Sequence, residues 1–565
     1  MNPISVPRHL KGLLWVILVT AVIVSLQPLP AAVSSPGFQS INILGDKFLV
    51  VSYSLSALCI LCLWYLEKSQ RLSNLILLGI VSLLTVNFWY LVSPNPLLFN
   101  SGFQSRAYYI ATESHIPSAL VDQYANSLPG LYLIWDSISY LTGVGIPGAA
   151  YIANIVVGSL AAVLSYAIST TFLGSRSYAF PTALLIIVGN PFLFRGIEVD
   201  SLYGLTLLLA FFFVLLKRPS SWKLPCLLIS LGALFLYPIP VIIILTGTSI
   251  YYVSSLVNAR QRSKNPLLRQ FLNWQYLVII GIIWSAWVAF FGESWLVNLS
   301  LIVDNHYASV GASTHGSFIA DLLGSNFLSG ELWSVLIIDS WLFLEFAIPL
   351  LIYIYFGLRN RSYFKSNVVA FSFAPLVVAF VLYFVGGPGD FVRPLLYVPF
   401  FSVQAIFVLF LMLKKGNAAS VIAVAITLLL MLPSMIAFFP NVGYDGYVQY
   451  DQTITAGSFI QHYMTKSSLI IDTQSITLEG YTNSNELVVP RFFAYSNSSS
   501  LVQSIDLMLA SSSNVVFPYA PMFAAQVARS YSNATGSAFV NHTLIKAILA
   551  TNVLYSNGLV LMAVG

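Results

Sequence analysis

SGFQSRAYYIATESHIPSALVDQYANSLPGLYLIWDSISYLTGV, residues 101–144, is a polar and aromatic stretch that separates two hydrophobic spans. It is too polar to cross a bilayer and too regularly patterned to be a slack linker. From Pro129 onward it becomes an apolar run with roughly helical spacing. We therefore predict a structured loop at the membrane surface, and this loop is the first candidate for a site. The charged residues among its aromatics are Arg106, Glu113, His115, Asp122 and Asp136.

The composition of the whole chain excludes a soluble protein. Hydrophobic residues make up 58% of the sequence and charged residues only 8%, and the mean hydropathy is +0.82. A soluble domain carries about 25% charged residues. The basic residues form short clusters between the spans, and nucleic-acid binding would instead require a basic face. Cys59, Cys62 and Cys226 all fall in apolar spans, which predicts lipid-embedded or core cysteines.

Runs of apolar residues predict an all-α polytopic membrane protein. A spanning helix needs about 20 mostly apolar residues, and one long run is broken by Tyr237-Pro-Ile-Pro240 into two short spans, because proline ends helices. The predicted spans are thirteen: 12–32, 47–66, 72–93, 148–172, 178–194, 203–217, 224–237, 239–257, 274–291, 333–356, 367–386, 395–413 and 418–438.

Charge predicts the orientation of these spans, because loops rich in Lys and Arg stay in the cytoplasm. Among the 20 acids of the chain, only Glu67 falls in the same loops as the basic clusters. The amino terminus is therefore predicted inside and the carboxyl terminus outside. The first span also reads as a signal peptide, and we favour an uncleaved helix. The basic residues of the predicted cytoplasmic loops are Arg8, Lys11, Lys68, Arg71, Arg176, Lys217, Arg218, Lys223, Arg260, Arg262, Lys264, Arg269, Arg359, Arg361, Lys365, Lys414 and Lys415.

The chain divides into three predicted regions. Residues 1–71 hold two N-terminal transmembrane helices, residues 72–438 a transmembrane core with the structured external loop 94–147, and residues 439–565 a small extracytoplasmic α/β domain. Within the last region, strands are predicted at 468–471 and 514–517. Residues 554–561 read as strand, Asn-Gly turn and strand, which is a hairpin signal. Helices are predicted at 522–530 and 542–551.

Acidic and basic residues at the predicted outer ends of spans are the candidates for chemistry. Glu113 and Asp122, beside His115 and Arg106, could supply a general base, and an interfacial helix with solvated charges is the alternative. Glu198 and Asp200, preceded by Arg195, resemble a pair that holds a divalent metal, Mg²⁺ or Mn²⁺, or else cap the next helix. Arg393, near Asp390, either binds a phosphate through its guanidinium or extends to the interface.

Taken together, these features resemble the GT-C superfamily, which are multispanning glycosyltransferases that use lipid-phosphate-linked sugars. The resemblance is to archaeal relatives of the dolichyl-phosphate-mannose–protein mannosyltransferases and oligosaccharyltransferases. Residues 108–117 and 124–143 look like the first external loop of that superfamily and its amphipathic-helix continuation. Residues 390–397 (DFVRPLLY) look like its late loop, and residues 554–558 like the closing hairpin of archaeal members.

The resemblance implies an active site on the outer face of the membrane. A polyprenyl-phosphate-linked sugar would place its phosphate near Arg393, and a protein or glycan acceptor would bind under the first loop and the C-terminal domain. A carboxylate would deprotonate the acceptor, and attack at the anomeric carbon would invert its configuration. The candidate catalytic residues are Asp122, Glu113, Glu198 and Asp200. The candidate substrate-binding residues are Arg393, Asp390, Arg106, His115, Tyr124 and Arg195.

One departure from the superfamily keeps other functions open. An Asp or Glu typically opens the first external loop of its members, whereas residues 100–105 (NSGFQS) contain no acid. Glu113, Asp122, Glu198 or Asp200 would then substitute, or the chain is a non-catalytic relative in surface-glycan or envelope assembly. A transporter or lipid-handling protein is the competitor from another class, and the sequence lacks the internal repeat expected of many transporters.

Overall fold

The structure is a computed structural model. It describes residues 8–27, 47–67, 70–92, 128–173, 176–188, 199–217, 223–257, 274–290 and 373–382, a few positions between 107 and 116, Pro394, Tyr397 and five C-terminal strands. Its helices are α1 (Arg8–Leu26), α3 (Lys47–Glu67), α4 (Arg71–Val92), α7 (Gly130–Thr142), α8 (Ile146–Leu173), α9 (Arg176–Val188), α11 (Val199–Lys217), α12 (Lys223–Leu236), α13 (Ile239–Val257), α15 (Trp274–Phe290) and an unlabelled helix, Phe373–Leu382.

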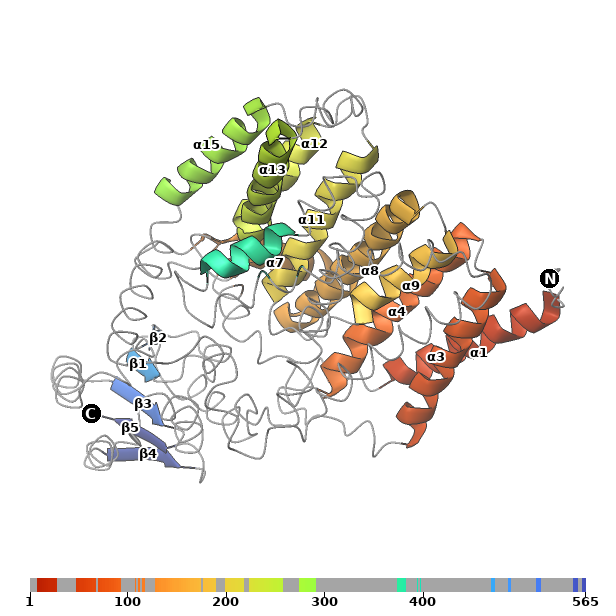
Figure 1. The fold of residues 1–565 in the computed structure, drawn as a ribbon. Helices are drawn as coiled ribbons and strands as arrows, with labels where there is room; N and C mark the ends of the chain where they lie inside the picture. Colours follow the sequence, from red (N-terminus) through yellow and green to blue (C-terminus); the bar gives the residue numbers. More distant parts are fainter. Residues whose placement is uncertain are drawn as a thin grey trace, which may run out of the picture.

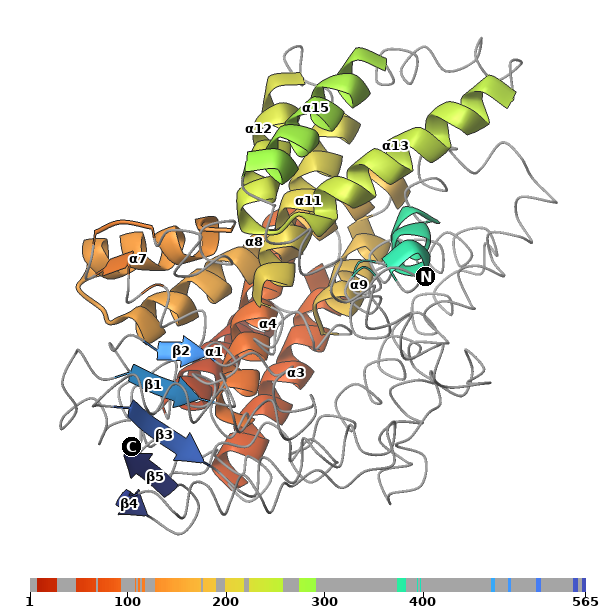
Figure 2. The ribbon, with the colours of Figure 1, turned by 90° about the vertical axis from the view of Figure 1, so that its left-hand side faces the viewer.

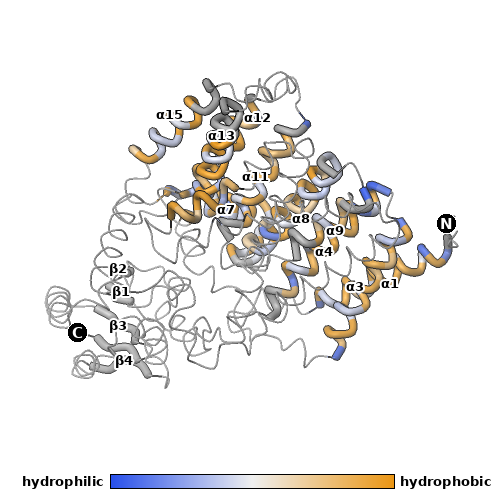
Figure 3. The backbone as a smooth tube through the Cα atoms, viewed as in Figure 1, coloured by the Kyte–Doolittle hydropathy of each residue, from blue (hydrophilic) through white to orange (hydrophobic). Residues whose placement is uncertain are grey.

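The described helices form a bundle. Figure 1 shows α1, α3 and α4 on one side, α8 and α9 in the middle, and α11, α12, α13 and α15 on the other side. Apolar residues run along most of each helix, and hydrophilic residues lie mainly near the ends (Figure 3). Buried apolar side chains from these helices make one large core, and Tyr166, Phe180 and Phe211 are among its largest fully buried members.

The helices follow the predicted spans. Four are long and apolar enough to cross a membrane by length and composition: His9–Leu26, Lys47–Glu67, Arg71–Phe88 and Gly148–Thr171. Shorter apolar helices coincide with the predicted spans from 203–217 to 274–291, and Phe373–Leu382 lies inside the predicted span 367–386. The predicted spans 333–356 and 418–438, and the span 395–413 apart from Tyr397, lie outside the described residues, so the predicted total of thirteen stays a prediction. The chain is a membrane protein.

The predicted break between two short spans is confirmed. The backbone N–H of Tyr237 donates to the Ala233 carbonyl (2.7 Å) where α12 ends, and α13 begins at Ile239. Pro240 lies in the first turn of α13, where the missing N–H of a proline removes no helical hydrogen bond. Figure 2 shows the two helices diverging from this turn.

Polar side chains join the three N-terminal helices within the apolar bundle. Asn87 of α4 donates from Nδ2 to the Ser25 carbonyl of α1 (2.8 Å) and to the hydroxyl of Tyr53 of α3 (2.7 Å). The hydroxyls of Ser25 and Ser52 are 2.9 Å apart. Such interhelical bonds hold helices together where lipid offers no hydrophobic driving force. They attach α1 and α3, the two helices predicted to precede the core, to its first helix.

We expect Asn87→Ala to lower the free energy of unfolding by about 1–2 kcal/mol, because two interhelical hydrogen bonds are lost. Titration of the purified protein in mixed micelles with a denaturing detergent measures this change. Thr85→Ala is the matched control on the same helix, since the Thr85 hydroxyl bonds only the Val81 carbonyl one turn away (2.8 Å). Equal losses in the two variants would contradict the role of Asn87.

The C-terminal strands form a five-stranded sheet in the order β2-β1-β3-β5-β4 (Figure 2). The strands are β1 (Leu469–Asp472), β2 (Glu486–Val488), β3 (Val515–Tyr519), β4 (Asn552–Ser556) and β5 (Leu561–Val564). β1 is parallel to β2 and β3, and β5 is antiparallel to β3 and β4. β1 and β3 lie at the two predicted strands, whereas the helices predicted at 522–530 and 542–551 lie outside the described residues.

The predicted hairpin is present with a different register. β4 and β5 pair antiparallel, but Ser556 pairs with Leu561. A two-residue Asn-Gly turn would have paired Ser556 with Leu559. The prediction of that tight turn was therefore wrong, because the β4–β5 register leaves residues 557–560 between the last paired positions.

Candidate functional site

The apolar run that opens at Pro129 folds as the amphipathic helix α7. Leu131, Tyr132 and Trp135 form its buried face, at the spacing of successive helical turns. Gly143 ends the helix with φ +70°, a left-handed conformation that favours glycine. Its N–H donates to the Ser139 carbonyl (2.9 Å). The loop predicted to be structured thus contains a helix with a defined apolar face.

The buried face of α7 packs on α8 and α11. Trp135 lies in a second apolar cluster with Ile146 and Ala150 of α8 and Tyr203 of α11. The indole N–H of Trp135 donates to the hydroxyl of Tyr203 (3.1 Å), and both side chains are buried. A hydrogen bond satisfies the polar atoms of these two large side chains, whose burial would otherwise be costly. The helix α7, part of the predicted first external loop, is therefore fixed to the start of α11.

The other end of α7 reaches the turn between α12 and α13. A Cβ atom built on Gly130 would lie 3.0 Å from the Phe235 carbonyl oxygen and 3.1 Å from two side-chain carbons of Leu236. Because that spacing leaves little room for a larger side chain, the first residue of α7 is packed closely against the end of α12. α7 thus joins the start of α11 to the end of α12.

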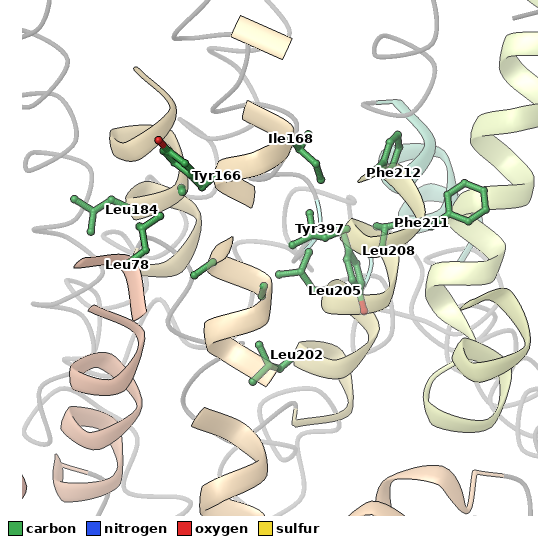
Figure 4. Close-up of a cluster of buried hydrophobic side chains, with 14 of the residues drawn as sticks. Leu78, Tyr166, Ile168, Leu184, Leu202, Leu205, Leu208, Phe211, Phe212 and Tyr397 are labelled. Atoms are coloured by element: carbon green, nitrogen blue, oxygen red, sulfur yellow. The ribbon is translucent and has the colours of Figure 1, made fainter. Parts of the chain in front are cut away.

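The late loop also contacts the start of α11. A Cβ atom built on Gly204 of α11 would lie 2.7 Å from the hydroxyl oxygen of Tyr397. It would also lie 2.8 Å from Cδ1 of Tyr237 and 2.9 Å from Cγ of Pro240. Tyr397 is fully buried, and its N–H donates to the Pro394 carbonyl (3.1 Å). Figure 4 shows its ring in the apolar cluster that includes Leu205 and Leu208 of α11.

These contacts bring three segments to the first two turns of α11. The segments are α7, the turn between α12 and α13, and the late loop at Pro394–Tyr397, and with the start of α11 they make four. The predicted topology assigns all four to the outer face. Their convergence at one end of the bundle is what a shared face requires, because segments on opposite faces would lie a membrane thickness apart, and the outer face stays a prediction.

The opposite end of α11 belongs to a different set of residues. Lys217 lies in its last turn, and Glu67, the one acid assigned to the cytoplasmic loops, is buried between α3 and α4. The hydroxyl of Ser73 donates to the Glu67 carboxylate. Near the same end, Asn74 of α4 donates to the hydroxyl of Tyr166 on α8 (3.1 Å). The side chains of Glu67, Ser73, Asn74 and Tyr166 thus hold helices together at this end.

The structure places only part of the predicted site. Asp200 lies in the first turn of α11, one turn before Gly204. His115 is exposed, and Ser114 before it has φ +57°. Asp136 is half-buried on α7. The remaining candidates lie outside the described residues: Arg106, Glu113, Asp122, Tyr124, Arg195, Glu198, Asp390 and Arg393.

Sequence reasoning missed the residues that join these segments. Trp135, Tyr203 and Gly204 lie in apolar runs and read there as ordinary core residues. The one local signal was Gly204 itself, because a glycine inside a helix is destabilising by about 1 kcal/mol and needs a reason. The sequence shows Tyr397 only as the last residue of the late motif and does not indicate which residue it would contact.

No metal centre is found among the residues that the structure describes, where His, Cys, Asp and Glu form no group of three or more. The Glu198 and Asp200 side chains, predicted as a metal pair, fall outside that search. Cys59 and Cys226 are buried and Cys62 is half-buried, and all three are free thiols on apolar helices. Their positions agree with the prediction of core or lipid-embedded cysteines.

Comparison with known proteins finds one kind of likeness. No protein-family model and no curated protein matches the chain. Among solved structures, the chain is similar to the crystal structure of ArnT from Cupriavidus metallidurans bound to undecaprenyl phosphate, with 12% sequence identity and a TM-score of 0.46. The similarity covers 88% of this chain and 98% of that one.

Proposed function

We propose that this chain is a membrane glycosyltransferase of the GT-C type. It transfers a sugar from a polyprenyl-phosphate donor to an acceptor on the outer face of the membrane. The observation that carries the proposal is the packing of Tyr397 on Gly204, which joins the late loop to the start of α11 beside the helix α7. In the resemblance, the late loop supplies the arginine for the donor phosphate and the first loop covers the acceptor.

Chain connectivity extends this packing to the charged candidates. Arg393 precedes Tyr397 by four residues, which span at most about 14 Å when fully extended. Asp200 precedes Gly204 by four residues on α11, a rise of about 6 Å. Arg393 and Asp200 are thus tied by short segments to the two sides of a single buried contact. A guanidinium on one side of this contact and a carboxylate on the other would suit the two ends of a phosphate-linked sugar.

The proposed reaction divides the work between these two groups. The Arg393 guanidinium binds the donor phosphate by charge-assisted hydrogen bonds and stabilises the negative charge that grows on it. A carboxylate accepts the proton of the acceptor hydroxyl or amide. The acceptor oxygen or nitrogen then bonds to the anomeric carbon, the bond from that carbon to the phosphate oxygen breaks, and polyprenyl phosphate leaves.

Among the four candidate carboxylates, Asp200 is favoured as the base because its position on α11 is fixed next to both loops. Glu113 and Asp122 of the first loop and Glu198 before α11 complete the candidate set. Asp390, Arg106, His115, Tyr124 and Arg195 remain candidates for binding the substrates. A divalent cation, Mg²⁺ or Mn²⁺, held by Glu198 and Asp200 would neutralise phosphate charge, and the reaction above does not depend on it.

The proposed organisation follows the predicted regions. Residues 1–71 add two helices to a catalytic core at residues 72–438, whose external loop at 94–147 includes α7. The sheet belongs to a soluble extracytoplasmic domain at residues 439–565, which suits the recognition of a protein or glycan acceptor. A role in archaeal protein glycosylation follows from the resemblance of this domain's closing hairpin.

We expect Tyr140→Cys to react with a membrane-impermeant maleimide in intact cells, because Tyr140 is 88% exposed on α7 and the topology places it outside. Lys217→Cys, at the exposed opposite end of α11, is the control and should react only after the cells are permeabilised. Native cysteines on spanning helices give little background. If Lys217→Cys reacts in intact cells and Tyr140→Cys does not, the orientation of the chain is the opposite of the proposed one.

The function is tested with the full chain in lipid nanodiscs, supplied with a radiolabelled polyprenyl-phosphate hexose and with extracted cell-envelope material as acceptor. We expect labelled sugar to enter the protein or glycan fraction and polyprenyl phosphate to be released in equal amount. Binding of the donor with no release would favour the non-catalytic relative, for which the missing acid in residues 100–105 is the supporting observation. If the chain neither binds the donor nor releases polyprenyl phosphate, both the catalytic and the non-catalytic role are excluded.

A further inference from the structure

The contact between Gly204 and Tyr397 is unusually close for a helix interior. Each of the three atoms nearest to a Cβ built on Gly204 lies within 3.0 Å, and each comes from a different residue: Tyr397, Tyr237 and Pro240. Three other glycines inside described helices have no such contact. A Cβ built on Gly79, Gly232 or Gly281 would meet no atom within 4 Å.

A glycine in the middle of a helix needs a compensating contact. Relative to alanine it destabilises the helix by about 1 kcal/mol, because the unfolded chain loses more conformational freedom. At Gly204 the compensation is room for the hydroxyl end of a buried tyrosine from the late loop. Tyr397 cannot occupy its place if α11 carries any side chain at this position.

We infer that Gly204 and Tyr397 are positioning residues for the proposed reaction: their contact sets where the late loop, with Arg393, lies relative to Asp200 on α11. The inference rests on the proposed function for its chemistry and on the packing for its geometry. Neither residue touches the reacting atoms. Tyr203, the neighbour of Gly204, fixes the first external loop through Trp135 in the same turn of α11, so one helical turn sets the position of both loops.

The test uses Gly204→Ala, with Tyr397→Phe as its compensating change and Gly232→Ala as its matched control. The new methyl group of Gly204→Ala would overlap the Tyr397 hydroxyl and displace the late loop. Tyr397→Phe removes the closest of the three overlapping atoms and the one that belongs to the late loop. The atoms of Tyr237 and Pro240 remain within 3.0 Å of the new methyl group, so the double variant should restore the position of the late loop and leave the turn between α12 and α13 displaced. Gly232→Ala adds the same methyl group to α12 in open space.

The first measurement is independent of any substrate. In a Val392→Cys background of the full chain, the rate of maleimide labelling reports the position of the late loop. We expect Gly204→Ala to change this rate at least about threefold, the double variant to restore it, and Gly232→Ala to leave it unchanged. An unchanged rate in folded Gly204→Ala, or a changed rate that Tyr397→Phe does not restore, would overturn the inference.

The second measurement is the affinity for undecaprenyl phosphate. We expect Gly204→Ala to weaken binding about tenfold or more, and the double variant to return it to within about threefold of the wild-type chain. If the labelling rates behave as expected but the wild-type chain binds no undecaprenyl phosphate, the proposed function fails and the positioning contact stands. If the wild-type chain binds and Gly204→Ala binds equally well, the positioning role is wrong while the proposed function survives.

Discussion

Asp200→Asn is expected to transfer sugar about 10²–10⁴-fold more slowly than the wild-type chain, which is the usual contribution of a general base. Asparagine has nearly the same shape as aspartate but cannot accept the proton of the acceptor. Binding of the donor should change little, because Arg393 remains to hold the phosphate. The measurement is the rate of label transfer from a radiolabelled polyprenyl-phosphate hexose, compared with the dissociation constant of the same donor.

Two comparisons separate catalysis by Asp200 from a structural role. An acid in the first turn of a helix also stabilises that helix by about 0.3–1 kcal/mol, so Asp200→Asn should lower the stability slightly whatever its role. Asp136→Asn removes an acid from α7 and should transfer sugar at nearly the wild-type rate. Full activity in Asp200→Asn would leave only the structural role and would direct the search to Glu113, Asp122 and Glu198.

Arg393→Ala is expected to weaken binding of the polyprenyl-phosphate donor by about 1.5–3 kcal/mol, roughly tenfold or more, since the phosphate loses a charge-assisted hydrogen-bond partner. Arg393→Lys keeps the positive charge but loses the planar pair of donors, so it should fall between the alanine variant and the wild-type chain. Donor affinity by equilibrium binding in nanodiscs measures both changes.

The matched control for Arg393 is Arg71→Ala, which removes an exposed arginine at the start of α4, on the predicted cytoplasmic side. It should bind the donor as the wild-type chain does. If Arg393→Ala also retains wild-type affinity, the late loop does not hold the phosphate. Arg393 would then be an interfacial arginine that extends to the head groups.

Hydropathy and charge predicted most of the helical fold, because membrane insertion depends on local composition. The break at Tyr237-Pro238 and the helix after Pro129 were predictable for the same reason: proline and amphipathic spacing act within one or two turns. The β4–β5 register was not predictable in this way. The Asn-Gly pair predicted a tight two-residue turn, whereas Ser556 pairs with Leu561.

The junction at the start of α11 could not be predicted from the sequence. Trp135 bonds a tyrosine 68 positions further along the chain, and Gly204 packs on Tyr397 from the late loop. Within their own segments these residues match any apolar span, and their partners are set by how helices pack in three dimensions. The charged candidates, by contrast, are conspicuous in the sequence. Among the catalytic candidates, Asp200 is the one whose backbone lies in the described part of the chain.

The central claim is that the outer end of α11 binds a lipid-linked phosphate, and the most direct test compares two ligands that differ only in that group. The purified full chain in nanodiscs is titrated with a polyprenyl phosphate and, separately, with the polyprenol of the same length. The account predicts saturable binding of the phosphate form, weakened by Arg393→Ala, and little binding of the alcohol. Equal binding of the two, or binding of neither, would contradict it.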